Sequence, residues 1–285
     1  MQDHDGAIRP RRSALYVPAA NARAIDKART LACDMVILDL EDSVAPEAKA
    51  VAREQAVRAI GGGGFGDKEV IVRINGEGAP WAEDDLAAVL ASGADGMLAP
   101  KVGHPSTIGR YGARIAAAGS HVSLWAMIET CGGVLDARAI ASAGAPLAGL
   151  VVGINDLATE MRCRPTPDRA PLQSFLALIV AAAHESGLVA LDGVYGELDD
   201  LAGFEGECRQ GADFGFDGKT LIHPSQIEPC NRLYAPSAED VAWAEAVVAA
   251  FAGPDANGKG AIRLQGRMVE RLHLRDAERL LQRAR

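Results

Sequence analysis

Short, continuous apolar runs alternate with amphipathic stretches along most of the chain. Runs without polar alternation indicate strands covered on both faces, as in parallel sheets packed between helices. The predicted strands are 13–18, 35–41, 69–75, 96–102, 122–130, 149–156, 188–195 and 214–220. The predicted helices between them are about 21–31, 46–60, 81–92, 106–118, 133–143, 170–186 and 199–209.

The alternation of eight strands with helices predicts an α/β fold, the (β/α)8 TIM barrel. An open, doubly wound parallel sheet is the alternative. We expect the barrel over 10–230, and a C-terminal helix and lid extension of the same domain unit over 231–285. Within that extension the pattern predicts a helix at 236–252, a flexible turn at 253–260 and a short helix at 274–284.

Composition narrows the functional classes. The 285 residues are 48% hydrophobic and 24% charged, which are ordinary values for a globular chain. A net charge of −9 and an aromatic content of 5% argue against a nucleic-acid partner. No apolar run is long enough to span a membrane and no apolar leader is visible, so we expect a cytoplasmic protein. Five widely spaced cysteines without a CxxC pair indicate reduced thiols rather than a zinc site.

Polar side chains end the predicted strands, on the face where a TIM barrel carries its chemistry. They are Asp39, Glu41, Asp42, Arg73, Asn75, Lys101, Glu129, Asn155, Asp156, Asp192 and Tyr195. Each charge buried there needs a partner or a metal ion, because an unpaired buried ion costs several kcal/mol.

Glu129 and Asp156 end consecutive predicted strands, which places them about 5 Å apart. Two carboxylates at that distance raise each other's pKa unless a cation lies between them. A divalent ion held by one or two carboxylates, water and substrate oxygens fits Mg²⁺. The pattern leaves open the alternative that both carboxylates pair with Arg73 and Lys101 without a metal.

Arg73 is the candidate anion clamp, because its planar guanidinium matches a carboxylate with two hydrogen bonds. The alternative is a structural ion pair with Glu41 or Asp42. Lys101 could instead be a Schiff-base lysine, since it ends a predicted strand.

A basic cluster of Arg9, Arg11 and Arg12 precedes the first predicted strand. Near the top of the barrel this cluster could hold phosphates, and otherwise it is a solvated arm. In an acidic chain such a local patch says more about partners than the net charge does.

Several short segments stand in order along the chain. They are RS at 12–13 with LYVP at 15–18, LDLEDSV at 38–44, VRIN at 72–75, PKV at 100–102, MIET at 127–130, GINDL at 153–157 and FDGKTLIHPSQ at 216–226. Together they resemble the HpcH/HpaI aldolase and citrate lyase β-subunit family, in register from about Arg12 to Ile227.

The resemblance implies a TIM barrel that acts on acyl-CoA substrates as a homo-oligomer, a trimer or a hexamer. It implies Mg²⁺-dependent cleavage or formation of a C–C bond in citramalyl-, malyl- or citryl-CoA, with an α-keto acid and an acyl-CoA as partners. The family's metal carboxylates fall on Glu129 and Asp156, and its carboxylate-binding arginine falls on Arg73. Glu41 and Asp42 would orient Arg73 or a metal-bound water.

The resemblance also implies contacts with the CoA part of the substrate at Arg12, His223 and Pro224. For His223 the alternative is a structural histidine at the start of a helix. These contacts would make CoA a part of the substrate, with Mg²⁺ as the cofactor.

The C-terminal segment departs from the family pattern. The lyases carry Gly-Lys-Met-Ile-Asp-x-Pro there, and the Asp reaches into a neighbouring subunit's site. This chain reads GRMVERLH at 266–273, so Glu270 replaces the Asp and Leu272 replaces the Pro. Glu270 is therefore a candidate for proton transfer in trans. The alternative is a surface ion pair with Arg267 or Arg271.

These observations predict a Mg²⁺-dependent acyl-CoA lyase, or the reverse condensation. A metal-dependent aldolase acting on free keto acids is the second enzyme hypothesis. The altered tail motivates a third, a non-catalytic or partner-dependent subunit.

Overall fold

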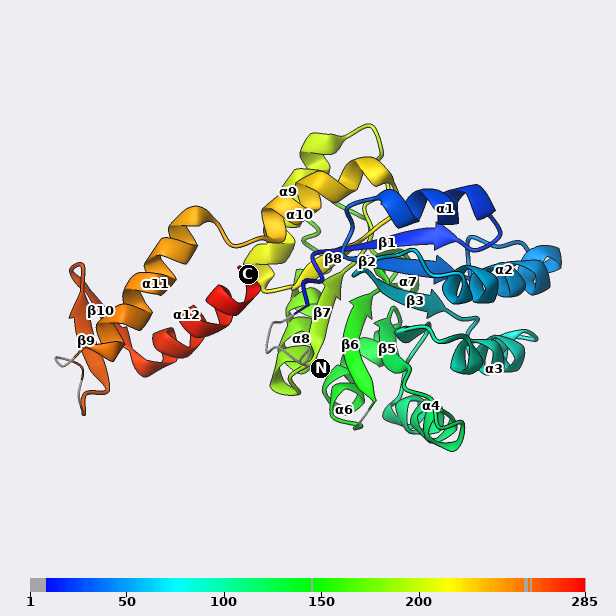
Figure 1. Ribbon diagram of the computed structural model, residues 1–285, viewed down its shortest axis with the longest axis horizontal. Helices are drawn as coiled ribbons and strands as arrows, with labels where there is room; N and C mark the ends of the chain where they lie inside the picture. Colours follow the sequence, from blue (N-terminus) through cyan, green and yellow to red (C-terminus); the bar gives the residue numbers. More distant parts are fainter. Residues whose placement is uncertain (1–8, 145, 254–255, 257, 285) are drawn as a thin grey trace. The chain divides into compact units, whose positions relative to one another are not determined.

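The structure is a computed structural model, and it describes residues 9–144, 146–253, 256 and 258–284. Among these residues, eight parallel strands close into a barrel in which each strand pairs with the next and β8 pairs with β1 (Figure 1). The strands are β1 (Ser13–Pro18), β2 (Met35–Asp39), β3 (Glu69–Arg73), β4 (Gly96–Ala99), β5 (Ser123–Ile128), β6 (Leu147–Val152), β7 (Val189–Asp192) and β8 (Gly218–Leu221). The predicted (β/α)8 TIM barrel is confirmed.

Helices cover the outer face of these strands (Figure 1). They are α1 (Ala22–Thr30), α2 (Lys49–Gly61), α3 (Ala82–Ser92), α4 (Pro105–Ala117), α5 (Cys131–Leu135), α6 (Ala137–Ala141), α7 (Ile154–Glu160), α8 (Gln173–Glu185), α9 (Leu201–Phe214) and α10 (Ile227–Tyr234). Short 3₁₀ turns, η1 (Pro46–Ala48) and η2 (Pro224–Gln226), precede α2 and α10. No described helix has the length and apolar character that crossing a membrane requires.

The apolar runs are continuous because both faces of the strands are buried. Every residue of β2 and of β3 is buried. Successive side chains of a strand point to opposite faces, so one set fills the barrel and the other packs against the helices. The inward set forms its own cluster, with Ala14, Met35, Ile37, Ile71, Leu98, Trp125, Met127, Val151 and Leu191.

Several strands end earlier than predicted. β6 stops at Val152, and α7 begins at Ile154, so Asp156 lies in the first turn of a helix and not on a strand. The sequence pattern missed this boundary because buried Ile154 and Leu157 of the helix continue the apolar run of the strand. The helix predicted at 133–143 is two short helices, α5 and α6.

A second unit comprises the described residues from Ala235 onward, with Arg9 and Pro10. It contains α11 (Ala238–Ala252), the antiparallel strands β9 (Ala261–Leu264) and β10 (Arg267–Glu270), and α12 (Arg271–Arg283). Its own small core includes Ala244, Val247, Val269 and Ala277.

The two helices of this unit were predicted, with α12 starting three residues earlier than expected, and the hairpin was not. Gln265 (φ 47°) and Gly266 (φ 81°) form the two-residue turn that joins β9 to β10. The predicted flexible turn at 253–260 falls partly outside the described residues.

Candidate active site

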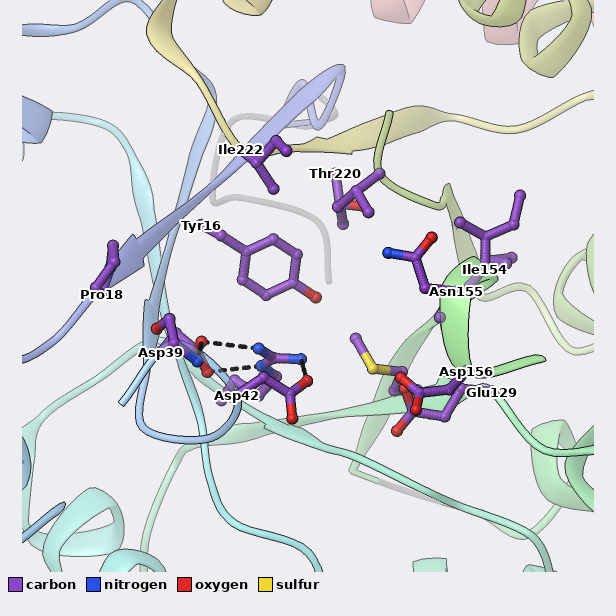
Figure 2. A pocket seen from close by; sticks show the side chains of 16 residues that line it. Tyr16, Pro18, Asp39, Asp42, Glu129, Ile154, Asn155, Asp156, Thr220 and Ile222 are labelled. Carbon is purple, nitrogen blue, oxygen red and sulfur yellow. Dashed lines mark hydrogen bonds and ion pairs between the residues drawn. The ribbon is translucent and has the colours of Figure 1, made fainter. Parts of the chain in front are cut away.

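A cavity of about 370 Å³ opens at the carboxyl ends of the barrel strands (Figure 2). It is the place where TIM barrels carry their functional residues. Its lining comprises Tyr16, Pro18, Asp39, Asp42, Ser43, Arg73, Met127, Glu129, Val152, Gly153, Ile154, Asn155, Asp156, Val194, Thr220 and Ile222.

Arg73 ends β3, and Asp39 is its register partner at the end of β2. Asp39 accepts hydrogen bonds from Arg73 Nε and Nη2, both at 2.7 Å, and from the backbone N–H groups of Glu41 and Ser43. Burial opposes ionisation of Asp39, but the bonds from Arg73 outweigh it and hold the pKa of Asp39 below its usual value. We call Asp39, Glu41 and Asp42 the acidic corner, and Asp39 is therefore the carboxylate of this corner that orients Arg73.

The second side of the guanidinium faces two further carboxylates. Arg73 Nη1 lies 3.1 Å from Asp42 Oδ2 and 3.2 Å from Glu41 Oε2. The side chain of Asp42 is 59% exposed, whereas that of Glu41 is 8% exposed. The structure thus brings Arg73, Glu41 and Asp42 together as predicted, and it adds Asp39 as the main partner of Arg73.

Lys101 connects the acidic corner to Glu129. Its Nζ lies 2.7 Å from Glu41 Oε1, and its backbone N–H donates to Glu129 Oε1 at 2.6 Å. Lys101 adopts φ 55°, a left-handed conformation that orients this N–H. Partial burial lowers the pKa of Lys101 and Glu41 raises it, with a net increase. A raised pKa disfavours the neutral amine that a Schiff base needs.

Glu129 follows β5 and is buried. Burial first, then the nearby Glu41 and Asp156, raise the pKa of Glu129 to about 8, although the Lys101 N–H opposes the shift. Gly153 passes so close to the Glu129 carboxyl that a Cβ at position 153 would overlap it. The backbone of the β6–α7 junction is thus shaped around Glu129.

Glu129 and Asp156 approach one another at the edge of the cavity (Figure 2). Neither side chain makes an ion pair with Arg73 or Lys101, whose ion pairs go to Asp39, Glu41 and Asp42. Among the described residues there is no group of three or more His, Cys, Asp or Glu side chains arranged to hold a metal. A metal at this place would therefore have two protein carboxylates as ligands.

The expectation that the basic cluster lies near the barrel top is wrong for Arg11 and Arg12. Both precede β1 and lie at the amino-terminal end of the barrel, opposite the cavity. Arg12 binds Asp34 with Nε and Nη2, each at 2.8 Å, and Arg11 Nε binds Glu69 at 2.5 Å. Arg12 is therefore a structural residue and cannot contact a substrate in this cavity.

His223 and Pro224 follow β8 on the cavity side of the barrel, yet neither lines the cavity. His223 is the N-cap of η2, with its Nδ1 2.7 Å from Ser225 Oγ. This is the structural role weighed as the alternative for His223. A contact of His223 or Pro224 with CoA stays a prediction.

Glu270 belongs to the second unit, where it is the N-cap of α12. Its backbone N–H donates to His273 Nδ1 at 2.9 Å. Its side chain receives a backbone N–H in the same capping box. The expected action of Glu270 in a neighbouring cavity stays a prediction.

Sequence reasoning missed Tyr16 and Thr220 as cavity residues. Asn155, which ends the sixth predicted strand together with Asp156, also lines the cavity. Tyr16 was detectable, because Ala14, Tyr16 and Pro18 share one face of β1, and Ala14 faces the barrel interior. Its ring lies against the guanidinium of Arg73, with 4.8 Å between the ring centroid and Cζ.

Asp192 and Tyr195, which also end a predicted strand, do not face the cavity. Asp192 joins a buried quartet with Arg169, Glu207 and Lys219, in which Arg169 Nη1 is 2.8 Å from Asp192 Oδ1 and Lys219 Nζ is 2.6 Å from Glu207 Oε1. Tyr195 donates its hydroxyl to a surface-exposed carboxylate in the next loop. Neither side chain lines the cavity.

The model of the HpcH/HpaI aldolase/citrate lyase family matches residues 12–224. The chain belongs to this family. A (3S)-malyl-CoA thioesterase of Cereibacter sphaeroides is 42% identical over 96% of this chain and 95% of its own. The citrate lyase subunit beta of Escherichia coli K12 is 36% identical over 92% of this chain and 89% of its own.

The fold of this HpcH/HpaI family member is also that of a solved relative. CitE of Mycobacterium tuberculosis, in complex with magnesium, acetoacetate and coenzyme A, matches with a TM-score of 0.80 and 31% identity, covering 97% of this chain and 99% of that chain. The relatives thus include a CoA-ester thioesterase as well as lyases. The names of these relatives therefore add thioester hydrolysis to the C–C bond cleavage that the sequence resemblance implied.

Proposed function

We propose that this protein cleaves the CoA thioester of a 3-hydroxy acid whose hydroxyl-bearing carbon also carries a carboxylate, the class to which malyl-CoA belongs. The observation that carries the proposal is one cavity shared by an oriented arginine, Arg73, and two unpaired carboxylates, Glu129 and Asp156. An arginine fork binds a carboxylate, and the carboxylate pair suits a hard divalent cation.

The donor set fits Mg²⁺. Glu129 and Asp156 are oxygen ligands, and their mutual repulsion contributes to the raised pKa of Glu129, which a divalent cation would relieve. The Lys101 N–H occupies Glu129 Oε1 and fixes the carboxyl group in place. When bound, a Mg²⁺ ion supplies charge that acidifies and orients the substrate hydroxyl.

Glu129→Gln and Asp156→Asn test this assignment. Each removes one anionic ligand with little change in shape, so each should abolish Mg²⁺ binding measured by calorimetry while the circular dichroism stays unchanged. Glu160→Gln is the matched control, since Glu160 is exposed at the end of the same helix, α7, and does not line the cavity. Unchanged Mg²⁺ affinity in both site variants would contradict the assignment.

Charge favours a substrate with a single carboxylate beside the thioester. Arg73 is the only cation among the described residues that line the cavity. A second substrate carboxylate, as in citryl-CoA, would meet Asp39, Asp42 and the metal-binding pair without a cation of its own. We therefore place malyl- and citramalyl-CoA ahead of citryl-CoA.

We assign thioester hydrolysis as the first candidate, because the relative at 42% identity is a malyl-CoA thioesterase. In that reaction water adds to the carbonyl carbon, the C–S bond breaks, and the products are malate and the CoA thiol. C–C bond cleavage is the second candidate, favoured by the citrate lyase relative. There the hydroxyl gives up its proton, the bond to the neighbouring CH₂ breaks, and that carbon takes up a proton, leaving glyoxylate and acetyl-CoA.

One experiment separates the two reactions. The purified chain is incubated with malyl-CoA and Mg²⁺, and free thiol and glyoxylate are measured together. Hydrolysis releases thiol without glyoxylate, whereas C–C cleavage releases glyoxylate without thiol. Arg73→Ala should remove whichever product appears. The same assay with citramalyl- and citryl-CoA defines the specificity. Formation of neither product from any of the three thioesters by the wild-type chain would contradict the proposed function.

A further inference from the structure

Tyr16 combines two properties inside the cavity. Its ring packs on the guanidinium of Arg73, and its hydroxyl oxygen is buried without a hydrogen-bond partner among the described residues. In Figure 2 the hydroxyl of Tyr16 points into the cavity, between β1 and the residues at the start of α7. Among the described residues, several buried side-chain atoms lack a hydrogen-bond partner, and of these only the Tyr16 hydroxyl belongs to a residue that lines the cavity.

A buried hydroxyl without a partner is costly, and native proteins keep few of them. Phenylalanine would fill the same space and keep the packing on Arg73. The extra oxygen of Tyr16 therefore contributes nothing to the stability of the barrel in this state. It becomes favourable when a ligand supplies an acceptor.

The chemistry of the hydroxyl defines that acceptor. Burial is the largest influence and raises the pKa of Tyr16 far above its usual value, with Asp39, Glu129 and Glu41 adding to the effect and Arg73 opposing it. The phenol therefore stays protonated at neutral pH. It can donate a hydrogen bond but cannot act as a base.

We propose that the hydroxyl of Tyr16 donates a hydrogen bond to a carboxylate oxygen of the bound substrate, the same carboxylate that Arg73 holds. This inference rests on the proposed function, because it takes the carboxylate-bearing 3-hydroxyacyl part as the occupant. The stacked ring places the hydroxyl beside the guanidinium, so one anionic group can accept from both. Tyr16 is in this view a substrate-binding residue that acts together with Arg73.

Tyr16→Phe is the direct test, with glyoxylate as the probe in the presence of saturating Mg²⁺. A hydrogen bond to a charged acceptor is worth about ten- to a hundredfold in affinity, so glyoxylate binding measured by calorimetry should weaken by that factor. Mg²⁺ affinity should not change. The free energy of unfolding should stay the same or increase, because the removed hydroxyl has no partner in the free protein.

Tyr234→Phe is the matched control. The hydroxyl of Tyr234 is also buried without a hydrogen-bond partner, but Tyr234 ends α10 and does not line the cavity. This variant should bind glyoxylate with wild-type affinity. Both variants thus remove one buried tyrosine hydroxyl, at the cavity in Tyr16→Phe and away from the cavity in Tyr234→Phe.

The outcomes are distinguishable. If the wild-type chain binds glyoxylate and Tyr16→Phe binds it equally well, the assignment of Tyr16 is overturned and the proposed function stands. If Tyr16→Phe lowers the free energy of unfolding clearly more than Tyr234→Phe does, the hydroxyl is a structural group and the assignment is again overturned. If the wild-type chain binds no glyoxylate with Mg²⁺, the assignment of Tyr16 is overturned, whereas the proposed function is decided separately by the release of thiol or glyoxylate from malyl-CoA.

Discussion

Two groups of charged side chains at the barrel differ in their charge balance. The buried quartet has two cations, Arg169 and Lys219, and two carboxylates, Asp192 and Glu207, and none of its side chains is more than 8% exposed. The second group, which we call the cavity cluster, has five carboxylates against two cations. Its members are Asp39, Glu41, Asp42, Glu129, Asp156, Arg73 and Lys101.

The balanced group needs no ligand. In the quartet, the partners hold the pKa of Asp192 below its usual value although burial alone would raise it. In the cavity cluster the two cations pair with Asp39, Glu41 and Asp42 and not with Glu129, and the pKa of Glu129 rises to about 8. Charge balance therefore separates a structural cluster from a binding site more clearly than burial does.

The largest expected effect tests the structural role of the quartet. Lys219→Met leaves two buried carboxylates with one cation, and breaking a buried pair in this way costs about 3–5 kcal/mol of unfolding free energy. Urea unfolding followed by tryptophan fluorescence measures it. Arg138→Met is the control, because it removes an ion pair with Glu185 that is exposed to solvent and therefore contributes little to stability. Equal effects of the two variants would refute the structural role.

The next effect tests the binding role of the cavity cluster. Arg73→Lys keeps the positive charge but replaces a fork with a point charge. Loss of a charge-assisted contact predicts about ten- to a hundredfold weaker glyoxylate binding. Arg110→Lys changes another arginine that grips a carboxylate, Glu77, outside this cavity, and should leave glyoxylate binding unchanged. If Arg73→Lys binds glyoxylate like the wild type, Arg73 is not the clamp.

A pH-dependent effect follows from the pKa of Glu129, which rises from the ordinary 4.5 to about 8 in the folded chain. The folded state thus favours the protonated carboxyl group of Glu129. The contribution of this group to the free energy of unfolding is therefore fully present below about pH 4.5 and is lost as the pH rises through 8. The metal-free wild type should become less stable over this range relative to Glu129→Gln. Thermal unfolding across the pH range measures the difference. Parallel pH profiles for the two chains would show that folding does not raise the pKa of Glu129.

The smallest expected effect concerns Glu270, whose carboxylate would reach the cavity cluster from another copy of this chain. If Glu270 transfers a proton there, Glu270→Asp shortens its reach by one methylene and should alter turnover several-fold, since proton transfer needs about 2.6–3.2 Å. Mixed oligomers of Glu270→Gln and Arg73→Ala chains should regain activity that neither has alone. No recovery in demonstrably mixed oligomers would leave Glu270 as the cap of α12.

The sequence predicted most of the barrel because continuous apolar runs are sufficient to locate buried strands. It also predicted Arg73, Glu129 and Asp156 as a group, because parallel strands in a barrel end on one face. The sequence prediction failed for Arg12, because it followed a family motif and did not consider that Arg12 precedes a strand. Residues that precede the strands of a barrel lie at the end opposite the cavity.

Other features depended on contacts that no local pattern contains. Asp39 and Asp42 lie within two residues of Glu41 in the sequence, and only the register with β3 shows which of them orients Arg73. The hairpin of the second unit was missed because its strands have four residues each and are only partly buried. The role of Tyr16 required the alternation of β1 to be followed residue by residue.

The left-handed backbone at Lys101 limits which residues can replace Lys101. The N–H that grips Glu129 belongs to the backbone, whereas the ion pair to Glu41 belongs to the side chain. A glycine adopts φ 55° without the penalty of about 1 kcal/mol or more that other residues incur. Glycine at this position would therefore preserve the grip on Glu129 and release Glu41, while valine or isoleucine would lose both. Mutation can therefore remove the side-chain contact to Glu41 and keep the backbone contact to Glu129.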